Sequence, residues 1–317
     1  MGERTGPVIG IDLGGTKLAA ALVSLDGRLT HRVTRPTCTD DAGTLVDQVC
    51  ELVTELLAVA SAPVRAVGIG AAGLVDRDRS TVRFAPNLPL NDVPLGELVA
   101  ERTHLDVTVE NDANAAAWAE YRFGAGRGAE SLAVVTVGTG IGAGIVLDGR
   151  LFRGSHGLAA EVGHLVLDPA GPPCPCGGAG CLESFASGRA LSAAARRLAG
   201  DGGAAGREIQ GSALAASALA GDQVAIEAFR QIGTSLGLGL AGLAAVLDVD
   251  AFVLGGGVAA AGELLRAPAE LALRDRLVGG AHRPRPDVRL AALGNDAGIV
   301  GAADLARVET NSSVVPV

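Results

Sequence analysis

The chain has 317 residues, of which 48% are hydrophobic and 19% are charged, and its formal net charge at neutral pH is −9. This length allows two domains of ordinary size, and this hydrophobic fraction excludes a largely disordered chain. The negative charge argues against a nucleic-acid-binding protein, because such a surface needs clustered positive side chains.

The first predicted element is a β-hairpin near the N-terminus. The apolar run from Val8 to Asp12 ends in a carboxylate, and a second apolar run covers residues 18–25. The turn between them is Leu13-Gly14-Gly15-Thr16-Lys17. It is not a Walker loop, because the Gly-Lys-Ser/Thr ending is absent and no helix follows. Backbone N–H groups in such a turn can meet a phosphate, although most glycine turns are only turns.

A second hairpin repeats the pattern of the first. The apolar runs 132–137 and 143–147 enclose the turn Gly138-Thr139-Gly140-Ile141-Gly142. Asp148-Gly149 follows this hairpin as Asp26-Gly27 follows the first one. The repeat predicts two similar lobes whose glycine turns grip one polyphosphate from both sides. The plain alternative is a coincidence between two ordinary hairpins.

Strands and helices alternate between the two hairpins. Apolar spacing predicts helices over 45–57, 94–103 and 113–121, and strands over 64–69 and 106–110. Asn111 and Asp112 therefore follow a strand directly, at the end where α/β sheets bind ligands. The alternative for Asp112 is a plain helix N-cap.

The stretch from Glu161 to Glu183 carries the strongest chemical signal in the sequence. One histidine and three closely spaced cysteines fall within it, and together they make the closed tetrahedral set of a structural zinc site: His164, Cys174, Cys176 and Cys181. Two carboxylates flank these ligands, and carboxylates are common acceptors for sugar hydroxyls. The alternative is three buried thiols beside a surface loop.

The C-terminal third is predicted to be largely helical from 187 to 247, with a glycine-rich loop at 200–206. The uncharged run 231–247 is short for a membrane span and rich in small residues, so we expect a buried helix. A strand at 251–254 leads into Gly255-Gly256-Gly257, where a flat ring can approach the backbone, and a helix is expected from about 259. A strand at 288–292, a helix at 298–308 and a loose tail at 310–317 complete the chain.

Several of these motifs together resemble the ROK family of sugar kinases and sugar-responsive repressors. The resemblance covers residues from about 8 to 307. Its most specific part is Glu161-x-Gly163-His164 with Cys174-x-Cys176-Gly177-x-x-Gly180-Cys181-x-Glu183. The two glycine turns resemble the phosphate motifs of the family's superfamily, and Leu254-Gly255-Gly256-Gly257 resembles its adenosine motif. Glu110-Asn111-Asp112-Ala113-Asn114-Ala115 resembles the family's sugar-site segment, and Ala85-Pro86-Asn87-Leu88 resembles the family's glucose-phosphorylating members.

The resemblance implies an α/β protein with a two-lobed actin-like, hexokinase-like ATPase fold of the ribonuclease H-like type and a cleft between the lobes. We expect a smaller lobe formed by 1–111 with 300–317, and a larger lobe formed by 112–299 that contains the zinc loop. Only seven residues precede Val8, so we expect no DNA-binding domain of the kind that ROK repressors carry. No signal-like segment opens the chain, and we expect a cytoplasmic protein without a membrane partner.

The implied reaction is transfer of the ATP γ-phosphoryl group to the 6-hydroxyl of glucose. The implied catalytic base is Asp112, and the implied sugar contacts are Asn87, Asn111, Asp112, Glu161, His164 and Glu183. Contacts to ATP and Mg²⁺ are expected from Asp12, Gly14, Gly15, Thr16, Lys17, Gly138, Thr139, Gly140, Gly255, Gly256 and Gly257. Zinc is expected to be structural, and the protein a homodimer or homotetramer. Two alternatives stay open: a kinase for N-acetylmannosamine or another hexose, and a non-catalytic sugar sensor.

Overall fold

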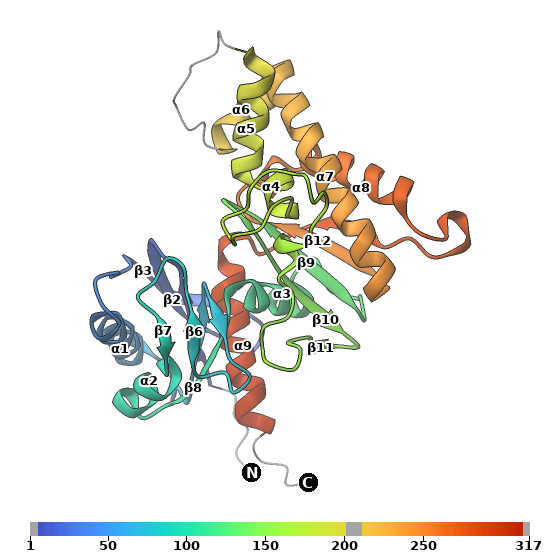
Figure 1. Cartoon of the computed structure of the whole chain (residues 1–317). Helices are drawn as coiled ribbons and strands as arrows, with labels where there is room; N and C mark the ends of the chain where they lie inside the picture. The colour runs from blue at the N-terminus through green and yellow to red at the C-terminus, as the bar shows by residue number, and fades with distance from the viewer. Residues whose placement is uncertain (1–5, 201–210, 313–317) are drawn as a thin grey trace. The chain divides into compact units, whose positions relative to one another are not determined.

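The computed structural model describes residues 6–200 and 211–312, and its contacts divide the chain into two compact units (Figure 1). The first unit contains Met1–Arg127, Leu151–Ala159 and Asn295–Val317, and the second contains Gly128–Arg150 and Ala160–Gly294. Most of the glycine-rich loop expected at 200–206, and the tail beyond 312, lie outside the described residues.

The first unit is built on a five-stranded sheet in the order β3-β2-β1-β4-β8. Strands β1, β2 and β3 are antiparallel, whereas β1, β4 and β8 run parallel. The strands are β1 (Val8–Leu13), β2 (Lys17–Val23), β3 (Leu29–Pro36), β4 (Ala66–Ala71) and β8 (Asp106–Asn111). A small second sheet contains β5 (Leu74–Val75), β6 (Val82–Phe84) and β7 (Asn91–Val93). The helices are α1 (Ala42–Val59), α2 (Leu95–Thr103), α3 (Asp112–Phe123) and α9 (Ala297–Ser312).

Helices cover both faces of this sheet, which explains why β1 is apolar almost throughout rather than alternating. Ile9 and Ile11 pack in the cluster that holds the buried side of α1, while Val8 packs with Ile299 of α9. A Cβ added at Gly10 would lie 2.1 Å from the carbonyl oxygen of Ile299, so only glycine lets α9 approach β1 this closely.

Helix α3 belongs with the first unit because it packs against α9. The contacts therefore divide the chain after Arg127 rather than between 111 and 112, and they place the short segment 151–159 with the first unit as well. The lobe limits expected from the sequence, 1–111 with 300–317 and 112–299, stay a prediction.

The second unit repeats the sheet order of the first, as β11-β10-β9-β12-β13. The predicted duplication of the hairpin is thus confirmed at the level of strand order and direction. The strands are β9 (Leu132–Val137), β10 (Ile141–Leu147), β11 (Arg150–Leu151), β12 (Ala251–Gly255) and β13 (Asp287–Leu290). The helices are α4 (Leu182–Ala186), α5 (Gly188–Ala199), α6 (Gly211–Leu219), α7 (Gln223–Leu247) and α8 (Glu263–Arg276). Short 3-10 turns are Val162–His164, Ala259–Ala261, Gly280–His282 and Gly294–Asp296.

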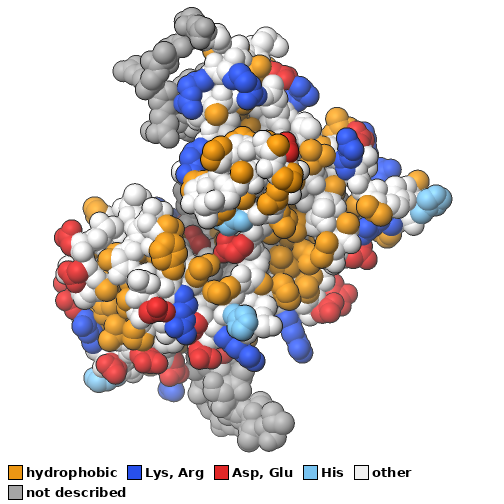
Figure 2. Space-filling model, viewed as in Figure 1, with side chains coloured by type: hydrophobic (Ala, Val, Ile, Leu, Met, Phe, Trp, Pro, Cys, Tyr) orange, Lys and Arg blue, Asp and Glu red, His pale blue; other side chains and the backbone are white. Residues whose placement is uncertain are grey.

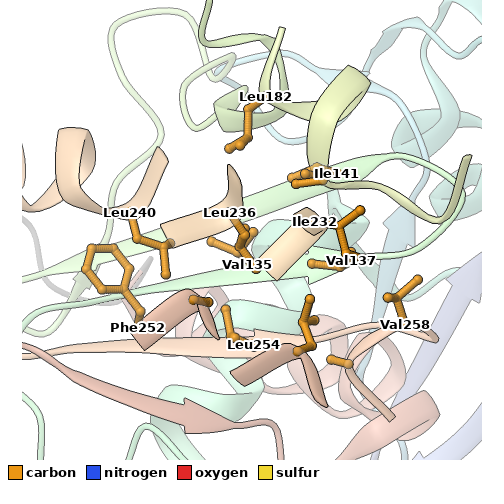
Figure 3. Packing of buried hydrophobic residues seen from close by; sticks show 14 of the residues in the cluster. Val135, Val137, Ile141, Leu182, Ile232, Leu236, Leu240, Phe252, Leu254 and Val258 are labelled. Carbon is orange, nitrogen blue, oxygen red and sulfur yellow. The ribbon is translucent and has the colours of Figure 1, made fainter. Parts of the chain in front are cut away.

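The core of the second unit lies between its sheet and the long helix α7. Figure 3 shows Ile232, Leu236 and Leu240 of α7 beside Val135 of β9 and Phe252 of β12. By length and composition α7 is apolar enough to cross a membrane, and half of its most apolar stretch is buried inside the protein. Its packing against the sheet and against α8 and α5 is that of the buried helix expected from the sequence.

Helix α8 begins later than the sequence predicts. The expected start near 259 is only a 3-10 turn, because Gly262 has a φ of +63° and interrupts the helical backbone before Glu263.

Candidate functional site

Three parallel strands of the first unit end at one edge of the sheet, and they carry the predicted polar residues there. Asp12 of β1 pairs with Gly70 of β4, and Ala71 of β4 pairs with Asn111 of β8. Asp112 follows as the first residue of α3. The fold therefore brings together Asp12, Asn111 and Asp112 at the carboxyl ends of the strands, where α/β sheets bind ligands.

The first glycine turn joins β1 to β2 at the same edge and is closed by a hydrogen bond of 3.1 Å from the Gly14 N–H to the Lys17 carbonyl. A Cβ added at Gly15 would lie 2.5 Å from the Cβ of Asn87. The predicted phosphate turn and the predicted sugar residue Asn87 are thus in direct contact. Thr16 and Lys17 are exposed at the tip of the turn.

Asp12 is a carboxylate at the carboxyl edge of the sheet that is largely withdrawn from water. Burial raises its pKa, and the positive charges of Lys17 and Arg32 oppose this effect. A Cβ added at Gly298, in the first turn of α9, would lie 3.2 Å from the Asp12 Oδ1 atom. An oxygen ligand in this position suits a hard cation such as Mg²⁺.

The helix cap that was the alternative role for Asp112 belongs to its neighbour. The Asn111 Oδ1 atom accepts a hydrogen bond of 3.0 Å from the Asn114 N–H, and Asn111 Nδ2 donates to the Gly73 carbonyl at 3.1 Å. Asp112 stands one residue further on, and its Oδ1 atom accepts from the Ala113 N–H at 2.9 Å. Both ends of the Asn111 amide are therefore engaged within the protein.

In the second unit, the four predicted metal ligands form one cluster. Their ligand atoms all lie within 4.8 Å of one another: His164, Cys174, Cys176 and Cys181. The Cys176 and Cys181 Sγ atoms are 3.7 Å apart, close to the roughly 3.8 Å that tetrahedral geometry with Zn–S bonds of about 2.3 Å requires. Desolvation and the neighbouring thiols raise the pKa of Cys181 to about 12. A bound cation would reverse this trend, because metals are bound by thiolates.

His164 presents its two ring nitrogens to different partners. Nδ1 lies 3.6 Å from the Cys174 Sγ atom, and Nε2 lies 3.9 Å from a carboxylate oxygen of Glu161. A metal ion on Nδ1 would fix the ring and leave Nε2 beside Glu161. Burial raises the pKa of the Glu161 carboxyl, the His164 charge lowers it, and the Glu183 charge raises it again.

Glu183 connects the metal cluster to the second glycine turn. Its Oε2 atom accepts from the Ile141 N–H at 3.0 Å, and its Oε1 atom accepts from Arg189 at 3.0 Å. A Cβ added at Gly140 would lie 2.1 Å from Oε2, so the turn needs glycine at this position. Arg189 belongs to none of the motifs in the sequence, and only its position on the first turn of α5 brings it to Glu183.

The second glycine turn and the glycine triplet share one edge of the second sheet. Gly255 at the end of β12 pairs with Thr136 of β9, and the Val258 N–H donates to the Val137 carbonyl at 2.9 Å. The Gly138 N–H closes its turn on the Gly140 carbonyl at 2.9 Å. Thr139 is exposed at the tip, and Gly257 has open space beside it. The exposed tip at Thr139 and the open space at Gly257 are features that suit a phosphate and a flat ring.

Glu110 is a second residue whose importance the motifs did not reveal. Its side chain is completely buried, and it forms ion pairs with Arg79 and Arg153. The two arginines stand 31 residues before and 43 residues after it, so no local spacing announces the cluster.

The chain is similar to known proteins over nearly its whole length. A model of the ROK family matches residues 8–309. A glucokinase of Streptomyces coelicolor is 45% identical over 95% of this chain and 98% of its own, and an Escherichia coli N-acetylmannosamine kinase is 37% identical over 95% and 98%. Among solved structures, a ROK family glucokinase from Streptomyces griseus in complex with glucose and AMPPNP aligns with a TM-score of 0.85 at 45% identity, covering 96% of this chain and all of its own. On the match of the family model and the identity to these relatives, the chain belongs to the ROK family.

Proposed function

We propose that this protein is an ATP-dependent glucokinase, which transfers the γ-phosphoryl group of ATP to the 6-hydroxyl of glucose. The observation that carries the proposal is the 45% identity to the Streptomyces glucokinases across almost the full length of both chains. The edge of the first sheet supports it, since the half-buried Asp12, a glycine turn and the Asn111–Asp112 step meet there.

In the proposed mechanism, Asp112 accepts the proton of the attacking hydroxyl. General-base catalysis of this kind contributes roughly 10²–10⁴ in rate. Asp12 would hold the Mg²⁺ that accompanies ATP, which neutralises charge on the phosphoryl oxygens. The remaining contribution of the protein is positioning: the backbone N–H groups of both glycine turns hold phosphate oxygens, together with Thr16, Lys17 and Thr139. Gly255, Gly256 and Gly257 admit the adenosine end.

The other sugar hydroxyls are assigned to polar side chains of both units. The proposed contacts are Asn87, Asn111, Glu161, His164 and Glu183. Each contact discriminates against a sugar that lacks or inverts the matching hydroxyl, because the protein group would then remain unpaired in the complex. For Asn111 and Glu183 the assignment adds to the hydrogen bonds that they already make within the protein.

We propose zinc as the metal of the His164–Cys174–Cys176–Cys181 cluster, in a structural role. Three thiolates and one imidazole complete a tetrahedral shell, so no position stays open for a substrate. The ion would anchor the loop from Glu161 to Glu183 and orient the His164 ring, and it takes no part in the chemical step. We further propose a cytoplasmic homodimer or homotetramer without a nucleic-acid partner; on the face that Figure 2 shows, basic and acidic side chains are mixed rather than gathered by sign.

Two other functions follow from other relatives. The N-acetylmannosamine kinases share 36–37% identity with this chain. A ROK family transcriptional regulator, a homologue of the E. coli MLC protein, aligns with a TM-score of 0.86 at 28% identity, and this chain covers 78% of it. The kinases favour N-acetylmannosamine as the substrate in place of glucose. The regulator favours a sugar sensor that binds sugar without turnover.

A panel of sugars in a coupled ADP assay tests the proposal. Glucose, mannose, galactose and N-acetylmannosamine are each supplied with ATP and, in parallel, with polyphosphate. We expect glucose with ATP to give the highest kcat/KM. A higher kcat/KM for N-acetylmannosamine would show that this sugar, and not glucose, is the substrate. Measurable sugar binding without ADP formation from any of the sugars would favour the sugar sensor.

A further inference from the structure

A buried cluster of charged side chains lies directly beneath the proposed catalytic segment in the first unit. The Glu110 carboxylate is completely buried, and its Oε2 atom lies 2.7 Å from Arg153 Nε and 3.3 Å from Arg79 Nε. The side chains of Arg153 and Arg79 are themselves only 11% and 16% exposed. A buried carboxylate is very costly without partners, so these three residues depend on one another.

The other oxygen of Glu110 binds one residue on each side of Asp112, through the backbone of Asn111 and the side chain of Asn114. Its Oε1 atom accepts from the Asn111 N–H at 2.9 Å and from Asn114 Nδ2 at 3.1 Å. Asn111 in turn caps α3 through the Asn114 N–H. One carboxylate is therefore the shared acceptor for the residue before Asp112 and for the residue two positions after it.

Arg153 ties a distant segment of the chain to this arrangement. It lies in the segment 151–159, which follows β11, and its two terminal nitrogens donate to the carbonyls of Arg77 and Asp76 at 2.9 and 2.8 Å. A Cβ added at Gly157 would lie 2.7 Å from the backbone of Val75 and Asp76, so the segment approaches the end of β5 closely at this residue. Burial lowers the pKa of Arg153, and the charges of Glu110 and Asp76 raise it.

We propose that Glu110, Arg153 and Arg79 are positioning residues, which set the backbone and hence the carboxylate of Asp112 for proton transfer. The proposal rests on the function proposed above, in which Asp112 is the base. Its physical reason is that a displacement of about 1 Å at a catalytic group costs on the order of 10²-fold in rate. Neither arginine needs to touch the substrate for this effect.

The test replaces Arg153 by methionine, which keeps much of the side-chain volume but cannot donate hydrogen bonds. We expect kcat for glucose phosphorylation to fall about 10- to 100-fold, while the KM for ATP changes less than about twofold. The matched control is Arg102→Met, which removes the ion pair of α2 with Asp47 in the same unit and contacts none of these residues; its kcat should equal that of the wild type. A folded Arg153→Met protein with kcat within twofold of the wild type would overturn the proposal.

A double-mutant cycle distinguishes positioning from a loss of folded protein. In the Asp112→Asn background, Arg153→Met should cause little further loss of kcat per glucose-binding site, because the group that it positions is already absent. Full additivity of the two substitutions would mean that Arg153 acts elsewhere, and the proposal would fail. If Arg153→Met does not fold, Arg153→Lys serves the same cycle, because the amine can reach Glu110 but cannot reproduce the guanidinium fork to both carbonyls.

Hydrogen exchange supplies a readout that does not depend on kinase activity. Arg153→Met should accelerate amide exchange in a peptide covering 108–116, and Arg102→Met should not. Unchanged exchange there would refute the positioning role even for an active enzyme. If Arg153→Met accelerates this exchange but the wild-type protein phosphorylates no sugar, the positioning role of the cluster would be supported and the proposed kinase function would be rejected.

Discussion

At the scale of single residues, the structure separates the roles of two neighbours that the sequence could not separate. Asn111 caps α3, and Asp112 stands one position into the helix. The oxygen that caps the helix comes from the Asn111 side chain, which accepts the Asn114 N–H. A catalytic assignment for Asp112 therefore does not compete with a capping role.

Asp112→Asn is the first residue-scale prediction. The amide keeps the shape and an acceptor oxygen but cannot take up a proton, so we expect kcat to fall by roughly 10²–10⁴. Glucose affinity, measured by calorimetry, should stay within a few-fold of the wild type. The control is Asp106→Asn, an exposed carboxylate at the opposite end of β8. A near-normal kcat for Asp112→Asn would remove it as the base.

The second residue-scale prediction concerns the stability cost of Asp12. Burial raises the pKa of Asp12 above the usual 3.8, so the folded protein favours the protonated carboxyl. The stability that this side chain contributes is therefore fully present below pH 3.8, and it is lost as the pH rises through the pKa of the folded state. Asp12→Asn should therefore be more stable than the wild type at pH 8, by about 0.5–2 kcal/mol. Urea unfolding should show this difference shrinking as pH is lowered toward 4. A variant that is less stable at every pH would contradict the sign, and with it the dominance of desolvation.

At the scale of elements, the two glycine turns are alike in sequence but differ in what surrounds them. A Cβ at Gly138 meets no atom within 4 Å, whereas a Cβ at Gly15 would collide with Asn87. Substitution at Gly138 therefore reports on phosphate binding alone, while substitution at Gly15 also disturbs a proposed sugar contact. A substitution at Gly256 is unsuitable as a test of the adenosine end, because the φ of this residue is +83° and an added Cβ would lie 2.5 Å from the Val137 carbonyl oxygen.

Gly138→Val is the prediction that follows. A branched side chain where the backbone must approach an anion should raise the KM for ATP at least about tenfold, and glucose affinity should remain unchanged. Gly242→Val in α7 is the matched control, because an added Cβ there also has open space. Unaltered ATP kinetics in a folded Gly138→Val protein would reduce the second hairpin to an ordinary hairpin.

The metal loop is the other element with a direct test. We expect one zinc per chain by metal analysis, lost in Cys176→Ser but retained in Cys38→Ser, a cysteine outside the cluster. Since binding free energy is part of folding free energy, loss of several kcal/mol should lower the unfolding temperature by about 10 °C or more. Glucose affinity should fall as well, because Glu161 and His164 lose their anchor. Full metal content in Cys176→Ser would exclude the proposed ligand set.

Short-range patterns predicted most elements, and long-range contacts explain what they missed. Each of the two hairpins, the strand before Asp112 and the ligand spacing of the metal loop depends on residues that lie close together in the sequence, and each has its counterpart in the structure. The late start of α8 depends on the backbone angle of Gly262. The ion pairs of Glu110 and the link from Glu183 to Ile141 join residues 31 to 43 positions apart, and no periodicity encodes them.

At the scale of the whole molecule, two units of equal sheet order carry different candidate site residues. The first carries the half-buried Asp12, Asn87 and the Asn111–Asp112 step, and the second carries the candidate metal ligands and the glycine triplet. The two units therefore share one arrangement of strands and turns, but the polar side chains that each carries differ. Where the compact units divide follows from the packing of α3 on α9, which no local pattern reveals.

The reaction proposed for this chain moves the γ-phosphoryl group of ATP to the 6-hydroxyl of glucose. Identification of the product by ³¹P and ¹³C NMR, with ADP measured in the same reaction, is its sharpest test. We expect glucose 6-phosphate and ADP in equal amounts, and neither at a comparable rate with Asp112→Asn. ADP without a sugar phosphate, or a phosphate on another hydroxyl of glucose, would contradict it.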